Sequence, residues 1–238
     1  MGLRCGRART IFRGWLAAAT NAEGSSAVDP SLAKPFVEPT FGRPPAGASL
    51  DHAQGYVAEV AWRMLAKEEH ADDRTIIHLE RPDSDVTSPG ADGFAIYRIH
   101  PTEQLAFRLW EIKKREGTGS VSTSIRNAYI QLDLHAERYL AKLTAQSEAP
   151  DSDAELVDFL ADLVPAWKRA DASAGAGVAL AADATSLPGR AFTTMHRHFP
   201  ALVDAGGIEG YLVGLGSLRE FTSFVRALLW TGLSTATT

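Results

Sequence analysis

Two apolar-rich runs separated by a five-residue polar break constrain the fold of this chain more than any other feature. The runs are Gly93 to Ile99 and Leu105 to Ile112, and the break reads His-Pro-Thr-Glu-Gln. This pattern predicts two antiparallel strands joined by a hairpin loop. The centre of a symmetric hairpin lies midway between Asp92 and Glu111, so these two acids are expected to face each other. Opposed Cβ atoms on paired strands lie about 4.5 to 5.5 Å apart.

A lysine belongs to the same predicted group. The period of two in a strand puts Glu111 and Lys113 on one face, behind the apolar stripe Leu105, Phe107 and Leu109. Two carboxylates about 4 Å apart repel by about 4 kcal/mol at an effective dielectric constant of about 20, and one lysine offsets only part of this. A hard divalent cation would offset the rest, and Mg²⁺ takes one or two carboxylates plus waters and substrate phosphate oxygens. The pattern indicates metal-assisted hydrolysis of a phosphodiester.

These residues resemble the active-site motif of the PD-(D/E)xK nuclease superfamily, in which an acid at the start of one strand is followed by Glu-x-Lys on the next. The matching positions are Asp92, after Pro89-Gly90-Ala91, and Glu111-Ile112-Lys113 within WEIKK. The resemblance implies an α/β, restriction-endonuclease-like fold with a mixed central sheet flanked by helices. It also implies DNA as substrate and Mg²⁺ as cofactor, with Mn²⁺ able to substitute.

A narrower resemblance concerns the C-terminal sequence GYLVGLGSLREFTSFVRALLW, which is similar to the small nuclease subunit of Hachiman-type bacterial anti-phage systems. That resemblance implies a helicase partner and a role in antiviral defence. Three alternatives remain open: a stand-alone restriction endonuclease or junction resolvase, a degenerate nuclease fold that serves as an interaction module, and an exposed hairpin on which Glu111 and Lys113 form only a surface ion pair.

The superfamily resemblance implies two further site residues. A helix is predicted from Asp51 to about Glu69, and Glu59 is the best match to a helix acid that joins the metal site in many relatives. The predicted core stripe of this helix consists of Val57, Val60, Ala61, Met64 and Leu65. A second stripe consists of Gly55, Glu59, Trp62 and Ala66. A second helix is predicted from about Ser122 to Ala145, and Gln131 matches a residue that orients water or phosphate. Asp83, in a literal Pro-Asp, is an alternative to Asp92, which the hairpin register favours.

The rest of the chain predicts an extension of the same sheet. Strands and helices alternate, which favours one α/β domain over a separate helical domain. The predicted elements are strands at 75–79, 177–182 and 208–216 and helices at 154–169, 190–199 and 218–229. Gly175 and Gly177 are predicted to lie in a turn, because they lack the remainder of a dinucleotide-binding fingerprint.

Composition limits how the chain can act. Residues 1–48 are predicted to form an irregular N-terminal arm or linker, because residues 21–49 are rich in Ala, Ser, Pro and Gly. Phe36 and Phe41 are its candidate anchors, and residues 49–238 are predicted to form the nuclease-like domain. The net charge of −5 argues against binding nucleic acid by bulk electrostatics, so we expect a local site or a partner. Lys114, Arg115 and Arg126 are candidates for backbone contacts. The single cysteine suits the cytoplasm, and no apolar run reaches the roughly 18 residues that a membrane span needs.

Overall fold

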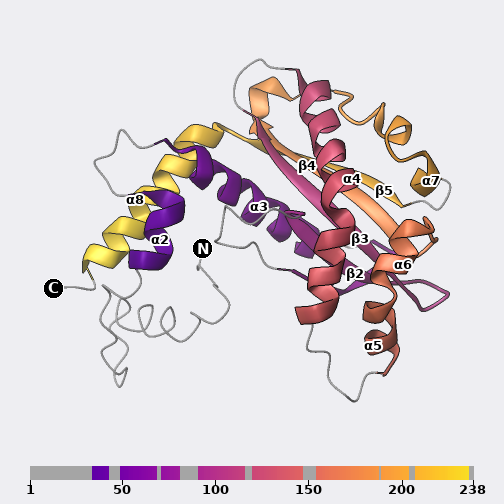
Figure 1. Cartoon of the computed structure of the whole chain (residues 1–238). Helices are drawn as coiled ribbons and strands as arrows, with labels where there is room; N and C mark the ends of the chain where they lie inside the picture. Colours follow the sequence, from indigo (N-terminus) through magenta and orange to yellow (C-terminus); the bar gives the residue numbers. More distant parts are fainter. Residues whose placement is uncertain are drawn as a thin grey trace, which may run out of the picture. The chain divides into compact units, whose positions relative to one another are not determined.

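A mixed five-stranded sheet flanked by helices forms the centre of this α/β protein (Figure 1). The computed structural model describes residues 34–42, 49–68, 71–80, 91–115, 120–146, 154–187, 189–203 and 207–235. Within these ranges, no helix is both long and apolar enough to cross a membrane.

The elements follow the predicted order with three differences. The helices are α2 (Lys34–Phe41), α3 (Asp51–Glu68), α4 (Val121–Gln146), α5 (Ala154–Ala161), α6 (Leu163–Lys168), α7 (Pro200–Val203) and α8 (Leu218–Thr235). The strands are β1 (Arg74–Leu79), β2 (Gly93–Ile99), β3 (Gln104–Arg115), β4 (Ala174–Asp183) and β5 (Ile208–Leu215). Two 3₁₀ turns, η2 (Ala184–Ser186) and η3 (Met195–Arg197), complete the set.

One predicted helix is interrupted, and a second predicted helix and one predicted turn were wrong. The predicted helix 154–169 is divided into α5 and α6 at Asp162, because Pro165 has no N–H to donate to the carbonyl four residues earlier. The predicted helix 190–199 is replaced by η3 and the short α7, since a residue that precedes a proline, here Phe199, is disfavoured in the helical region. Gly175 and Gly177, predicted as a turn, lie inside β4.

The strand order in the sheet is β1-β2-β3-β4-β5. β1, β2 and β3 pair antiparallel, whereas β3, β4 and β5 pair parallel. A parallel pair needs a long crossover, and α4, α5 and α6 supply it between β3 and β4. Strand β3 is therefore central: its residues 107–110 pair with β2 on one edge and β4 on the other, and its residues 111–115 continue the pairing with β4.

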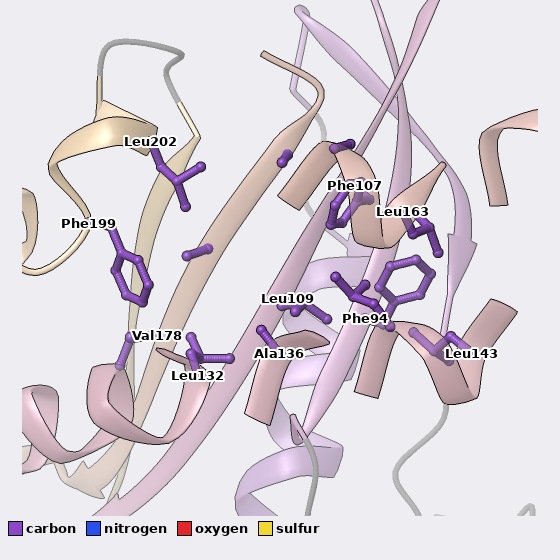
Figure 2. Close-up of a cluster of buried hydrophobic side chains, with 14 of the residues drawn as sticks. Phe94, Phe107, Leu109, Leu132, Ala136, Leu143, Leu163, Val178, Phe199 and Leu202 are labelled. Carbon is purple, nitrogen blue, oxygen red and sulfur yellow. The ribbon is translucent and has the colours of Figure 1, made fainter. Parts of the chain in front are cut away.

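Helix α4 covers one face of this sheet (Figure 1). One stripe of its residues is buried: Ile125, Tyr129, Leu132, Ala136, Leu140 and Leu143. They pack with Phe94 of β2 and with Phe107 and Leu109 of β3, as the cluster in Figure 2 shows. The stripe of β3 that leads to Glu111 therefore faces α4.

The C-terminal part of α3 covers the opposite face. Trp62 and Ala66, from the second predicted stripe, are buried there together with Ala58. Of the predicted core stripe, Val57 is buried, whereas Met64 and Leu65 are 50% and 42% exposed. Trp62 packs on Trp110 of β3 with ring centroids 5.4 Å apart. Helical spacing alone defined two possible stripes, and the position of Trp110 on the sheet selects one.

Glycines in the strands make room for these indole rings. A Cβ atom on Gly177 would lie 2.3 Å from the Trp110 ring, and one on Gly93 would lie 2.5 Å from Trp62. Gly177 of β4 therefore allows Trp110 to lie flat across the neighbouring strand, where its ring also stacks on Tyr211 at 5.0 Å.

The sheet is strongly curled on the Trp110 face. Arg74 of β1 and Glu209 of β5 form an ion pair of 2.6 Å, although β1 and β5 are the two edge strands. In a flat sheet four strand spacings would separate these edges by about 19 Å. Arg108 of β3 also pairs with Glu209, and both guanidinium groups approach the ring of Tyr97, at 4.9 and 5.5 Å. Charged side chains thus join the two edges across the concave face.

By contacts between Cα atoms the chain divides into two compact units. One comprises residues 1–57, 83–88 and 216–238, and the other residues 58–82 and 89–215. In the first unit α2 and α8 pack together: Trp230 Nε1 donates to the Gly42 carbonyl at 2.6 Å, and the buried Phe41 contacts Tyr56 edge-on. The predicted anchoring role of Phe41 is confirmed. Most of the predicted arm, residues 1–33 and 43–48, lies outside the described residues. The sheet belongs to the second unit.

Candidate active site

The register of β2 and β3 brings Asp92 next to Glu111. Gly93 pairs with Trp110, so the next positions outward along both strands are Asp92 and Glu111, as the hairpin symmetry predicts. The Ile112 N–H donates to Asp92 Oδ2 at 2.7 Å. This backbone hydrogen bond holds the Asp92 carboxylate against the strand that carries Glu111.

Lys113 links this acid pair to helix α4. Its Nζ donates to Glu111 Oε1 at 2.6 Å and also to Oε1 of Gln131. The Lys113 side chain is 25% exposed, whereas that of Glu111 is only 4% exposed. The ammonium group therefore lies at the mouth of the site, between a buried acid on the sheet and an amide on the helix.

Burial changes the proton affinity of both acids. Desolvation raises the pKa of Glu111 to about 8, with repulsion from Asp92 adding to the rise and Lys113 opposing it. Desolvation also raises the pKa of Asp92, against the lowering effects of the Ile112 N–H and of Lys113. Two acids that interact this strongly titrate as a pair. Without a cation, the pair retains a proton at neutral pH.

The second oxygen of Glu111 lacks a partner when the acid pair is ionised. Glu111 Oε2 is buried and receives no hydrogen bond from a donor group of the described residues, so it is unsatisfied once the pair loses the proton that joins Glu111 to Asp92. A buried acceptor without a partner costs about 1 to 3 kcal/mol, and a hard cation that prefers carboxylate oxygens would remove this cost. The donor set of Asp92 and Glu111 therefore fits Mg²⁺, which needs only one or two protein carboxylates.

Glu59 is not brought into this group. It lies half-buried on α3, whose neighbouring residues Ala58 and Trp62 pack on the Trp110 face of the sheet, while Glu111 belongs to the face that α4 covers. Among the described ranges, no three His, Cys, Asp or Glu side chains come together as a possible metal group. The alternative acid Asp83 lies in the segment 81–90, outside the described residues.

Sequence reasoning missed one contact of the pair and one further acid at this end of the sheet. One is the Ile112 N–H, which no side-chain pattern could single out. The other is Glu80, which follows β1 and donates its N–H to the Phe94 carbonyl at 2.8 Å, while its carboxylate accepts from Tyr139 of α4. Its position directly after a strand that pairs with β2 was a usable signal for an acid at this end of the sheet.

The basic residues singled out in the sequence lie around the site in different settings. Lys114 is half-buried and, as the neighbour of Lys113 in β3, belongs to the opposite face. Arg115 Nη1 donates to the Ser186 carbonyl at 2.8 Å, which ties the end of β3 to η2. Arg126 is exposed on α4. Among the described residues, Lys113 is the cation whose charge lowers the pKa of both acids.

Comparisons with known proteins add no assignment. No protein-family model matches the chain, and no curated protein matches it in sequence. The functional argument therefore rests on the geometry of Asp92, Glu111, Lys113 and Gln131.

Proposed function

We propose that this chain is a metal-dependent nuclease that hydrolyses phosphodiester bonds in DNA. The observation that carries the proposal is the buried carboxylate pair with an unsatisfied Glu111 oxygen and a lysine ammonium at 2.6 Å from the other oxygen. A pair of this kind is costly in a metal-free protein, and Lys113 offsets only part of the cost. Perturbed acids beside a lysine are typical of catalytic sites rather than of surface ion pairs.

Each residue has a distinct role in the proposed reaction. Asp92 and Glu111 would hold Mg²⁺, or Mn²⁺ in its place. The cation, when bound, lowers the pKa of a bound water and draws charge from the phosphate. Lys113 would place its positive charge either where negative charge develops on the phosphate or beside the attacking water. Gln131 holds Lys113 from α4, and the Ile112 N–H holds Asp92 in position.

The substrate and the partner follow from charge and from the resemblance. A chain with net charge −5 is expected to bind duplex DNA weakly at physiological salt, because affinity depends on how many phosphates are neutralised. A partner that delivers the strand would remove this limitation. The similarity of the C-terminal sequence to a helicase-associated nuclease supports a helicase as that partner, with this chain as the effector subunit in anti-phage defence.

Metal dependence tests the nuclease proposal directly. Purified protein is expected to cut DNA with Mg²⁺ or Mn²⁺ and to be inactive in excess EDTA. Ca²⁺ should support binding only, because its longer and more flexible coordination aligns water and phosphate poorly. Calorimetry should detect Mg²⁺ binding in the wild type and not in Glu111→Gln. Equal Mg²⁺ binding by both proteins, or full activity in EDTA, would contradict the proposed site.

The partner is tested separately. Co-expression with a helicase encoded next to this chain should give a stable complex that cuts DNA faster than the isolated chain at physiological salt. The readout is co-purification followed by cleavage of a labelled duplex. Rapid cutting by the isolated chain, with no gain from the helicase, would favour a stand-alone endonuclease.

A further inference from the structure

Three hydrogen-bonded polar side chains, Thr75, His100 and Glu103, form a relay at the opposite end of the β2–β3 hairpin from the acid pair. Thr75 Oγ1 of β1 is 2.8 Å from His100 Nε2, and His100 Nδ1 is 2.7 Å from Glu103 Oε1. The seven residues of β2 separate His100 from Asp92, a distance of about 20 Å or more along a strand. The proposed nuclease chemistry uses none of these three residues.

The hydrogen-bond chemistry fixes the direction of this relay. An ionised carboxylate can only accept, so the bond to Glu103 places the proton of a neutral imidazole on Nδ1. The other nitrogen, Nε2, then carries a lone pair and accepts from the Thr75 hydroxyl. A hydroxyl bonded to a base that a third group orients is the arrangement of an activated nucleophile.

The backbone holds Glu103 in an unusual conformation that supports the relay. Its φ angle is 59°, in the left-handed region that non-glycine residues rarely adopt because it strains the backbone. The Glu103 N–H donates to the Ile99 carbonyl at 2.7 Å, and the Glu103 carbonyl accepts from Arg98 at 2.8 Å. The strained residue is thus the one that orients the imidazole, and its neighbours hold it there.

Thr75 lines a cavity of about 540 Å³. This volume is within the usual range for small-ligand sites. Arg63 and Lys67, one turn apart on α3, also line it, together with Asp72. Arg63 Nε donates to the Glu80 carbonyl at 3.1 Å, which fixes its guanidinium near this wall. The two cations could stabilise negative charge on a substrate or on a developing oxyanion.

We propose that Thr75 is a nucleophilic hydroxyl that accepts an acyl group from a small activated donor with an anionic leaving group, such as an acyl phosphate. The Thr75 oxygen forms a bond to the acyl carbon, and its proton passes to His100 Nε2. The bond between the acyl carbon and the leaving-group oxygen then breaks. The leaving group departs with the electron pair and takes the proton from His100. Glu103 stabilises the imidazolium that exists between the two transfers.

Acetylation of the intact chain tests this proposal. The full-length protein is incubated with acetyl phosphate or p-nitrophenyl acetate, and acetylated peptides are identified and timed by mass spectrometry. We expect an acetyl ester on Thr75, its absence in Thr75→Val, and a rate about 100-fold lower in His100→Ala. Glu103→Gln should slow the reaction less than His100→Ala, because a glutamine oxygen can still accept from Nδ1.

Thr102 provides the matched control. It lies in the same hairpin turn, but its hydroxyl donates to the Ile99 carbonyl at 3.3 Å instead of contacting the imidazole. In the Thr102→Val variant, Thr75 should therefore be acetylated at the wild-type rate. His100→Gln serves as a second variant if His100→Ala melts at a lower temperature than the wild type. The proposal is overturned if Thr75 is acetylated no faster than Thr102 in the wild-type chain, or if the Thr75 rate is unchanged without His100.

Discussion

Glu111 carries a large electrostatic cost in the described part of the site. It ends an apolar stripe on the face of β3 that α4 covers, so its charge has little access to water. Desolvation, with Asp92 adjacent, raises its pKa to about 8. A cation that binds the ionised pair must therefore displace a proton at neutral pH, and the affinity for Mg²⁺ is expected to increase as the pH rises toward 8.

The stability of the metal-free protein should fall as the pH rises. The folded pKa of Glu111, about 8, lies above the ordinary value of 4.5, so between these values the folded state binds more protons than the unfolded state. Unfolding free energy is then lost across this window, on the order of 2 to 4 kcal/mol. Urea denaturation at pH 5 and pH 8 in EDTA should show the loss in the wild type. Glu111→Gln, in which Asp92 is the acid of the pair that still titrates, should lose less; parallel pH profiles for the two proteins would contradict the assignment.

Lys113 should matter for the chemical step rather than for folding. Its Nζ contacts Glu111 and Gln131 at the mouth of the site and makes no core contact in the described structure. Lys113→Ala is expected to lower kcat by at least about 100-fold and to leave the melting temperature within a few degrees of the wild type. Lys114→Ala, the same change on the opposite face of β3, should retain kcat, with any effect confined to KM. An equal loss of kcat in both variants would show that only total charge matters.

At the scale of elements, the packing of Trp110 connects the sheet to the site. Trp110 immediately precedes Glu111, and its ring is held between Trp62 of α3 and Tyr211 of β5, above Gly177 of β4. A displacement of this ring would move the strand position that carries the acid. The glycine is thus a condition for the geometry of the proposed active site.

Gly177→Ala should therefore destabilise the protein, by about 1 to 3 kcal/mol, because its Cβ would lie 2.3 Å from the Trp110 ring. Denaturant titration and the near-ultraviolet circular dichroism of the tryptophans are the readouts. Gly55→Ala is the matched control: Gly55 lies inside α3, and nothing lies within 4 Å of an added Cβ. It should stabilise the chain by about 0.5 to 1 kcal/mol. A similar loss in both variants would rule out the specific clash with Trp110.

At the scale of the whole molecule, the ion pairs of Glu209 join the two edges of the sheet. Arg74 of β1 and Arg108 of β3 converge on this one carboxylate of β5, and all three side chains are at most 17% exposed. A buried pair of this kind adds little net stability compared with apolar packing, but removal of one partner leaves a buried charge uncompensated. The curl of the sheet therefore depends on all three residues being present together.

Glu209→Ala is expected to lower the free energy of unfolding by about 3 to 5 kcal/mol, as measured by urea denaturation. The control is Arg98→Ala, which breaks the more exposed pair with Glu155, where the side chains are 26% and 56% exposed. That loss should stay below about 1 kcal/mol. If the two losses are equal, the edge-to-edge pairs do not constrain the sheet.

The sequence by itself determined the hairpin and the acid pair. Alternating apolar residues on both sides of a short break fix which residues pair, and symmetry then places Asp92 opposite Glu111, as the observed register has it. The face on which Glu111 and Lys113 lie follows from the same period of two. These are local properties of adjacent chain, so the pattern of residues is sufficient to predict them.

Only the tertiary structure decided the environment of that pair and the shape of the sheet. The contact of Gln131 with Lys113 joins residues on separate elements, the choice of Trp62 over Met64 as a core residue depends on Trp110, and Arg74 meets Glu209 only because the sheet curls. Each of these depends on packing between segments distant in the sequence. The energy of such contacts depends on burial and on the identity of the partner, and neither is a property of the local residue pattern.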